Sequence, residues 1–289
     1  MIDKNLQNCD YVLDKNHNFW IIQKGGPVIY ANPVFFADKQ GDRYNHITKK
    51  RYKKVIVKNQ NPEILKKSQI KKVFHPKEYF NKNFRRLSGI WKKIPESLMC
   101  IGIDKKNIGI FGSSLIGFEI EKDVDFVVYG KENCIKVMNN IDFIRKYVKA
   151  NKISKNHINY QSKKYSLFLT PKNDFKKMLR NKWSSLQIAK GLLNTIRFVY
   201  KINEMPKDIE INKGKEKVFS GKVTDSFDTN FVPRIFYIDS CGKLIRVLSY
   251  FWAYQSCVKN RQKVKVFGNY DKKNNTLYLS KKNHWIKII

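Results

Sequence analysis

The feature that most constrains the fold is a short apolar strand that ends in a glycine–serine turn, followed by a second strand that opens with two aspartates. Residues 108–111 form the first apolar run, and Asp123 and Asp125 begin a second run that extends to residue 129. Because side chains alternate between the faces of a strand, both carboxylates point to one face and their apolar neighbours to the other. Two like charges on one face repel each other, and a divalent cation between them offsets that repulsion.

The turn between the two strands suits a phosphate group. Gly112 lets the backbone come close to a phosphate, Ser113 can donate its hydroxyl or its N–H to a phosphate oxygen, and Ser114 extends the same turn. An aspartate at the end of a buried strand is, taken alone, often a helix cap or a loop acceptor. The conjunction of strand, turn, helix-length spacer and paired aspartates instead predicts a site for a metal–triphosphate complex.

These residues carry a family resemblance. Gly112-Ser113, nine residues, and then Asp-Val-Asp-Phe from Asp123 resemble the signature of the DNA polymerase β-type nucleotidyltransferase superfamily. Gly117 matches a small residue often found within the spacer. More narrowly, the chain is similar to the archaeal predicted nucleotidyltransferases that combine this core with β-rich flanks. That likeness extends over residues 125–134, 41–43 with 51–55, and 223–226 with 231–233.

The resemblance implies an α+β fold with a polymerase β-like nucleotidyltransferase core, flanked by a small N-terminal β domain and a small C-terminal β-barrel. It implies that Asp123 and Asp125 bind Mg²⁺ or Mn²⁺ and act in catalysis, with a nucleoside triphosphate as the substrate. It also implies that Gly112, Ser113 and Ser114 hold the β- and γ-phosphates. An acceptor hydroxyl then attacks the α-phosphorus and pyrophosphate leaves, with two metal ions stabilising the entering and leaving oxygens.

The chemistry usually needs a third carboxylate on a neighbouring strand, and the sequence does not place one there. The strand expected over residues 195–201 carries no acid; Arg197 on it can contact the triphosphate but cannot bind a metal. We expect Glu204 or Asp225 to supply the third ligand. Further acids that could do so are Glu119, Glu121 and Asp228. The departure leaves open a catalytically degenerate descendant of the fold that binds RNA.

The charge of the chain points to a nucleic-acid partner. Lysine and arginine total 58 against 24 acidic residues, which gives a formal net charge of +34 among 289 residues. Such an excess repels itself unless a polyanion screens it, and phosphates neutralised by lysine release counterions that drive binding. Codon bias toward lysine explains part of this usage, but not so uneven a ratio of bases to acids. We expect RNA rather than DNA.

Other residue types exclude several classes of protein. The five cysteines and five histidines are dispersed, without the paired spacing of a zinc site or a disulfide framework. No apolar run has the length of a membrane span. We therefore expect a cytoplasmic protein with no membrane partner. The sequence leaves open which nucleotide is transferred, the acceptor, template or primer dependence and the oligomeric state.

Patterning divides the chain into four expected segments. Residues 1–58 predict a basic β-rich domain, 59–98 a helical connector, 99–205 the nucleotidyltransferase core, and 206–289 an OB-like β-barrel. Basic residues alternate with aromatics over 39–54, which suits phosphate contact and base stacking, although a solvated hairpin fits equally well. Aromatic residues of the barrel that could stack on bases, although most are expected in its core, are Tyr237, Tyr250, Phe251, Trp252 and Tyr254.

Three functions remain open at this point. The first is a nucleotidyltransferase acting on RNA. The second is a non-catalytic RNA-binding or ribosome-associated protein on the same fold. The third is a nucleotidyltransferase acting on a small molecule or a protein, which would need neither the charge of +34 nor two basic flanks. The salt dependence of RNA binding separates the third from the other two.

Overall fold

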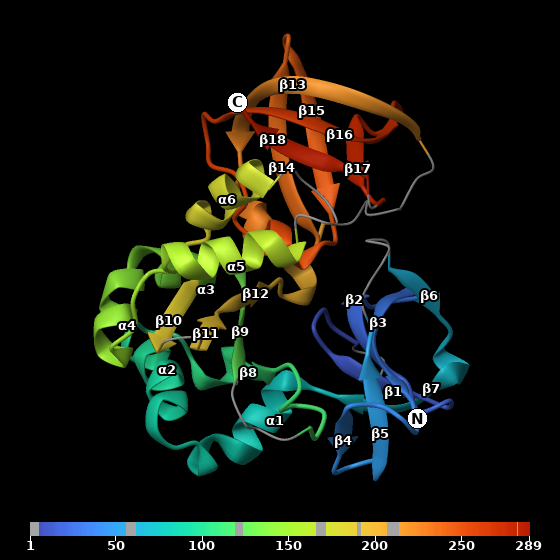
Figure 1. The fold of residues 1–289 in the computed structure, drawn as a ribbon, viewed down its shortest axis with the longest axis vertical. Helices are drawn as coiled ribbons and strands as arrows, with labels where there is room; N and C mark the ends of the chain where they lie inside the picture. Colours follow the sequence, from blue (N-terminus) through green and yellow to red (C-terminus); the bar gives the residue numbers. More distant parts are fainter. Residues whose placement is uncertain are drawn as a thin grey trace. The chain divides into compact units, whose positions relative to one another are not determined.

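The computed structural model describes residues 6–55, 62–118, 124–165, 172–189, 192–206, 214–281 and 283–289. The fold is mixed α+β, with six α-helices in this part of the chain (Figure 1). Its contacts divide the chain into two compact units. The first holds residues 1–57, 62–152 and 184–205, and the second holds 58–61, 153–183 and 206–289. The chain therefore passes between the two units several times.

An open antiparallel sheet forms the N-terminal part of the first unit, with seven strands in the order β4-β5-β3-β2-β1-β7 and β6 beside β3. The strands are β1 (Tyr11–Asp14), β2 (Phe19–Lys24), β3 (Ile29–Ala37), β4 (Arg43–Asn45), β5 (Lys50–Lys54), β6 (Glu63–Leu65) and β7 (Ile70–Phe74). The sequence predicts a turn at Asn32-Pro33, but β3 runs through it. Pro33 is accommodated because it pairs with Trp20 next to a register shift in β2.

The expectation of a helical connector from residue 59 is wrong for its first part. Residues 63–65 and 70–74 are strands, and helices begin only at Pro76. The apolar residues Ile70 and Phe74 are buried when β7 pairs with β1. A partner strand from the start of the chain thus decides a conformation that local spacing does not reveal.

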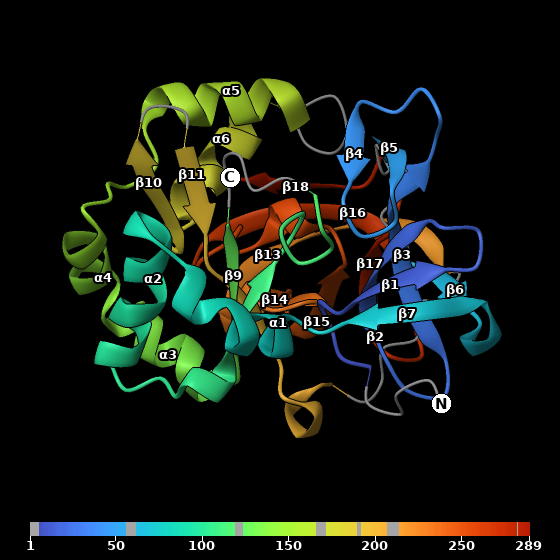
Figure 2. The ribbon, with the colours of Figure 1, turned by 90° about the horizontal axis from the view of Figure 1, so that it is seen from below.

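The rest of the first unit is built on a three-stranded sheet, β12-β9-β8. The central strand β9 (Asp125–Tyr129) is antiparallel to β8 (Ile108–Phe111) and parallel to β12 (Arg197–Val199). Its helices are α1 (Pro76–Asn83), α2 (Gly89–Cys100), α3 (Lys131–Asn139) and α4 (Ile141–Val148). A hairpin of β10 (Ser185–Ala189) and β11 (Leu192–Thr195) precedes β12, and α2 packs beside α4 (Figure 2).

Three local expectations differ from the structure. Ser113 is expected to begin a short helix, but residues 113–117 form turns. The single helix expected over 134–148 is two helices, because the backbone of Asn140 leaves the helical conformation and begins α4. The helix expected over 174–193 ends at Asn181, where the chain turns into the β10–β11 hairpin. Residues 167–169, for which the sequence predicts either a strand or a buried helix turn, lie outside the described residues.

One aromatic core joins the N-terminal sheet to the three-stranded sheet. Phe118, at the end of the turn after β8, lies 4.5 Å from Phe35 and 5.9 Å from Phe19 between ring centroids. The same buried cluster includes Val127 of β9 and Val199 of β12. Residues on both sides of the boundary expected near residue 58 therefore share one core.

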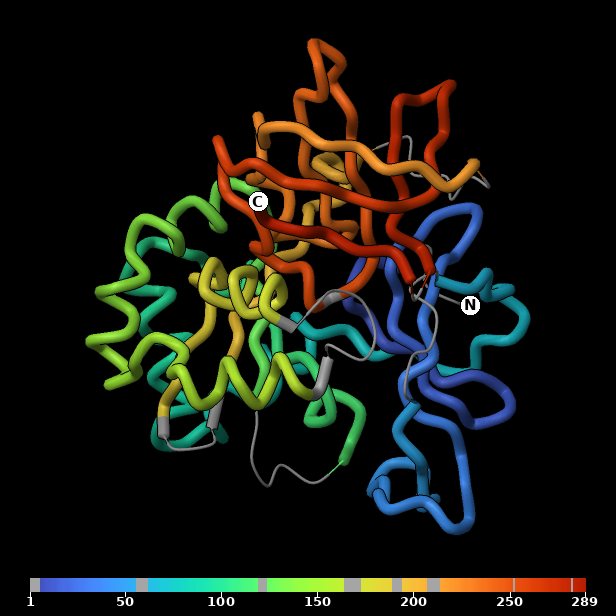
Figure 3. Tube along the Cα trace, turned by 45° about the horizontal axis from the view of Figure 1, so that its top comes forward, coloured from blue at the N-terminus to red at the C-terminus, as the bar shows by residue number. Residues whose placement is uncertain are grey.

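The second unit contains a closed β-barrel, as the sequence predicts. Its strands are β13 (Lys215–Asp225), β14 (Arg234–Ser240), β15 (Lys243–Ser249), β16 (Lys263–Asp271), β17 (Thr276–Leu279) and β18 (Trp285–Ile288). The order β13-β14-β15-β17-β16 closes by a pairing of β13 with β16, and β18 adds to β16 outside that ring (Figure 3). Helices α5 (Lys155–Tyr165) and α6 (Lys172–Asn181) belong to this unit, and residues of both enter the core of the barrel.

Short 3₁₀ helices complete the fold: η1 (Lys67–Gln69), η2 (Phe84–Arg86), η3 (Lys105–Asn107), η4 (Ile202–Glu204), η5 (Phe227–Asn230) and η6 (Trp252–Tyr254). None of the helices in the described ranges has the length and apolar character needed to span a membrane.

Candidate functional site

The structure brings the glycine turn against the aspartate strand. Asp125, the first residue of β9, pairs with Phe111, the last residue of β8. Gly112 follows with a φ of +83°, in the left-handed region that favours glycine. A Cβ atom at this position would lie 3.2 Å from the Asp125 Oδ2 atom. Glycine thus leaves open the space in front of this carboxylate.

The turn after Gly112 is held by its own backbone. The Ser113 carbonyl accepts N–H bonds from Ile116 at 3.3 Å and Phe118 at 3.1 Å. Ser113 is partly exposed, whereas Ser114 is 2% exposed. Of the two serines expected to hold phosphate, Ser113 therefore offers an accessible hydroxyl and Ser114 does not.

The second predicted metal ligand, Asp123, lies outside the described residues, as do Glu119 and Glu121. Within the ranges that the structure describes, no group of three or more His, Cys, Asp and Glu residues could hold a metal ion. The donor that is described fits a hard cation, because Asp125 offers carboxylate oxygens and Gly112 keeps the space beside them open. Of the two aspartates expected to bind the metal, Asp125 is therefore the one that the structure describes.

Arg197 lies on the strand where a third acid is expected. With Gly112 and Asp125 it forms the cluster of candidate site residues. It opens β12 and pairs with Val127, two residues along β9 from Asp125. Its guanidinium carbon is 4.5 Å from the centroid of the Phe111 ring. Its Nε atom is buried without a hydrogen-bond partner in the described part of the chain. A buried N–H without an acceptor is costly, and an anionic ligand would supply one.

Sequence reasoning missed Tyr11, which comes to this cluster from β1. Its ring centroid is 5.4 Å from that of Phe111. Burial raises the pKa of Tyr11 well above its usual value, while the charge of Arg197 lowers this pKa and that of Asp125 raises it. Both charged groups thus act on one phenol. No local signal could identify Tyr11, because its neighbours in the sequence lie far from the Gly-Ser turn.

The structure does not bring Glu204 to Asp125. Its carboxylate accepts the Lys131 N–H at 3.0 Å and the Lys201 N–H at 3.0 Å, and so caps the first turn of α3. Lys131 follows the end of β9, whereas Asp125 begins it, and four strand steps span about 13 Å. Glu204 is therefore a capping residue at the opposite end of the strand.

Asp225 has a local role in the second unit. It ends β13, and its Oδ1 atom accepts the Phe227 N–H at 2.9 Å, which forms a tight turn.

Among the aromatic residues considered for stacking, Tyr250 is 5% exposed and Tyr254 is fully buried. Tyr237 is half-buried and lines a shallow pocket of about 300 Å³ beside Arg246.

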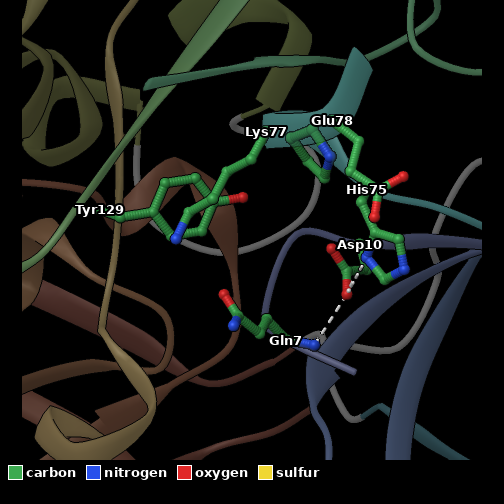
Figure 4. A pocket seen from close by; sticks show the side chains of 7 residues that line it. Gln7, Asp10, His75, Lys77, Glu78 and Tyr129 are labelled. Carbon is green, nitrogen blue, oxygen red and sulfur yellow. Dashed lines mark hydrogen bonds and ion pairs between the residues drawn. The ribbon is translucent and has the colours of Figure 1, made fainter. Parts of the chain in front are cut away.

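A small polar pocket of about 170 Å³ in the first unit was not predicted (Figure 4). The buried Asp10 lies 3.1 Å from His75 Nδ1 and accepts the Gln7 N–H at 2.8 Å. The Lys77 Nζ lies 4.0 Å from the centroid of the Tyr129 ring, and burial lowers the pKa of Lys77. The pocket lies at the end of β9 remote from Asp125. Asp10 and His75 are distant in the sequence, so spacing could not reveal the pair.

The basic hairpin expected over residues 39–54 is formed by β4 and β5. Lys50, Arg51, Lys53 and Lys54 are exposed, whereas Tyr52 between them is fully buried. The other aromatic residue of the hairpin, Tyr44, is 42% exposed. The hairpin thus offers a basic surface with one accessible tyrosine, and its second tyrosine belongs to the core.

Comparisons with protein-family models, with curated proteins and with solved structures found no match for this chain.

Proposed function

We propose that this protein is a Mg²⁺-dependent nucleotidyltransferase that transfers a nucleoside monophosphate from a nucleoside triphosphate to an RNA acceptor. The observation that carries the proposal is the Gly112 turn, which packs against the Asp125 carboxylate at the start of β9. Paired carboxylates beside a glycine turn are the combination that the sequence resemblance requires.

The topology supports the same proposal. Helix α2 leads into β8, the turn and β9, helices α3 and α4 follow, and the chain later returns with β12 parallel to β9. We expect this order of elements in a polymerase β-like core. Such a core has the two aspartates on the central strand and the third carboxylate on the strand parallel to it.

Each residue of the cluster has a role in the proposed reaction. Asp123 and Asp125 would hold Mg²⁺ or Mn²⁺, which when bound stabilises negative charge on the phosphates. The Gly112 backbone lets a phosphate approach, the Ser113 hydroxyl donates to it, and Arg197 offsets its charge. The acceptor hydroxyl forms a new bond to the α-phosphorus as the bond to pyrophosphate breaks, and the hydroxyl proton passes to solvent.

The choice of RNA as acceptor rests on charge. The net charge of +34 and the exposed basic residues of the β4–β5 hairpin favour a long polyanion over a small acceptor. A small-molecule or protein acceptor would leave this charge without a role.

One observation favours a second candidate, a catalytically degenerate RNA-binding or ribosome-associated protein. Arg197 occupies the strand where a third carboxylate is expected, and Glu204 is engaged as a helix cap. Neither residue provides the metal ligand that usually activates the attacking hydroxyl. Such a protein would bind RNA without transferring a nucleotide.

Labelling separates the two candidates. The full chain is incubated with each α-labelled nucleoside triphosphate, Mg²⁺ or Mn²⁺, and total cellular RNA. Asp125→Asn is the test variant. Asp104→Asn is the matched control, because this aspartate is 67% exposed and pairs only with Lys106 among the described ion pairs.

We expect label to enter RNA with the wild-type protein and with Asp104→Asn, and transfer to fall at least about 100-fold with Asp125→Asn. Absence of transfer from all four nucleotides, together with equal RNA binding by all three proteins, would favour the binding protein. Label on a small molecule or on protein would refute RNA as the acceptor.

A further inference from the structure

Three neighbouring strands of the second unit, β13, β16 and β18, present ordered rows of side chains on their outer side. The strands lie side by side in Figure 3, with β16 between the other two. In register, Val218 of β13 pairs with Phe267 of β16, and Phe267 pairs with Trp285 of β18. Two residues along, Ser220 pairs with Lys265, and Lys265 pairs with Lys287. The register thus gives an apolar row beside a basic row.

The alternation of the strands identifies this side as the outer one. The intervening residues Val264, Val266 and Ile286 are fully buried in the barrel core. Their neighbours Lys265 and Lys287 are exposed. Side chains at alternate positions lie on opposite faces, so the two rows face away from the core.

The apolar row is unusual for the outer side of a barrel. Val218 is 46% exposed, and Phe267 and Trp285 are half-buried. The centroids of the two aromatic rings are 5.9 Å apart and their planes differ by 33°. Adjoining apolar side chains left accessible on a strand face mark an interaction site more often than scattered ones do.

Lysines lie along one side of this row. Lys263 and Lys265 lie two residues apart on β16, about 6.6 Å along the strand, and Lys287 is one strand spacing, about 4.8 Å, from Lys265. All three are exposed. The lysines can therefore reach successive charges of one extended anion.

Two carboxylates border the rows, and both have other contacts. Glu216 Oε1 pairs with Lys281 Nζ at 2.8 Å, and this hydrogen bond lowers the pKa of Glu216. Asp239, opposite Lys222 in the register, accepts the Gly242 N–H at 2.8 Å. The charge of the face remains positive after these pairs are counted.

We propose that this lysine–aromatic face, formed by Val218, Phe267, Trp285, Lys263, Lys265 and Lys287, binds a single strand of RNA. Unpaired bases stack on the two aromatic rings, and the lysines contact the phosphates. Duplex RNA hides its bases and offers no ring to stack, so it binds this face less well. The choice of RNA over DNA rests on the proposed function, whereas the face itself rests on the register.

Binding is measured by fluorescence anisotropy of a labelled single-stranded 20-mer RNA with the full chain, without nucleotide or metal. Trp285→Leu keeps apolar bulk but removes the ring, and Trp285→Phe keeps a ring. The double variant Lys265→Ala/Lys287→Ala removes two charges of the face. Lys93→Ala/Lys146→Ala is its matched control, because it removes two exposed lysines from helices of the first unit.

We expect Trp285→Leu to weaken binding about 5- to 150-fold, which corresponds to the loss of about one stacked base, and Trp285→Phe to restore most of it. The lysine pair of the face should lower the slope of log K against log salt by about 1.4, compared with a much smaller change for the control pair. Circular dichroism spectra that match the wild type show that the variants are folded.

Several results would overturn the inference. These are unchanged binding by Trp285→Leu, equal effects of the two lysine pairs, or duplex RNA or polyglutamate binding as tightly as the single strand. Equal binding of DNA of the same sequence would refute RNA as the occupant. Because no nucleotide is present, failure of label transfer with normal binding refutes only the proposed function, and the reverse pattern refutes only this inference.

Discussion

Replacing Phe118 by alanine should destabilise the first unit by about 3–5 kcal/mol, the usual cost of removing a buried phenylalanine ring. Phe118 is 5% exposed. Its ring centroid lies 4.5 Å from Phe35, 5.5 Å from Tyr52 and 5.9 Å from Phe19. Each aromatic pair adds about 0.5–1.5 kcal/mol beyond burial, so the loss should fall in the upper half of this range.

The assay is urea and thermal unfolding of the full chain, followed by circular dichroism. For a unit of this size, about 1 kcal/mol shifts Tm by about 2–4 °C. Phe118→Ala should therefore lower the Tm of the first unit by about 10 °C or more. Phe118→Leu retains most of the volume and should cost less than half as much. Phe143→Ala, at a ring that is 45% exposed on α4, should change stability by about 0.5 kcal/mol or less.

A loss below about 1 kcal/mol for Phe118→Ala would refute the reasoning, because it would mean that the ring is not part of a packed core. Hydrogen exchange gives a second criterion. If β1 to β3 kept full protection while β8 and β9 lost theirs, the N-terminal sheet would be an independent domain. The division near residue 58 would then be correct and the shared aromatic core would not couple the two sheets.

Further predictions test the site and the barrel. Gly112→Ala should abolish label transfer and cost about 1–2 kcal/mol of stability. The matched control Gly102→Ala, with a φ of +79° and open space around its Cβ, should cost the same and keep transfer. Glu204→Gln should cost about 1–2 kcal/mol and leave label transfer measurable, because the carboxylate caps α3; lost transfer at unchanged stability would contradict this role. Burial lowers the pKa of His284, so the native state binds fewer protons than the unfolded state does. The contribution of neutral His284 to the free energy of unfolding is full above about pH 6.5. It is lost as the pH falls, by at most about 1.4 kcal/mol per pH unit. Urea titrations between pH 5 and 7.5 check this slope, which His284→Gln should flatten.

The barrel was predictable because several short apolar runs follow one another at regular spacing, and the first residues of β16 alternate between buried and exposed. Lysines at 263 and 265 with valines at 264 and 266 define a strand with one buried face, whatever its partner. The strand β7 was not predictable in this way, because its partner β1 comes from the start of the chain.

In the candidate site, too, some residues were predictable from local spacing and others depend on contacts between distant parts of the chain. The meeting of Gly112 and Asp125 follows from local spacing, since the two strands are consecutive along the sequence and pair with each other. Tyr11 arrives through a strand pairing that no spacing encodes. The expectation for Glu204 fails because distance along the chain does not reveal which end of β9 a later residue approaches. Arg197 is on the expected strand, and its contact with the Phe111 ring depends on packing.

The interleaved path of the chain has a consequence for its synthesis. Residues 153–183 separate β9 from β12, so the three-stranded sheet stays incomplete on the ribosome until residue 199 has emerged. By then α5 and α6 exist, but the barrel that buries Phe175 and Met178 has not been made. The last hundred residues take about 5–20 s to translate. During this interval the apolar side chains of Phe175 and Met178 lack the barrel that covers them in the folded protein, so this topology exposes part of its core while synthesis continues.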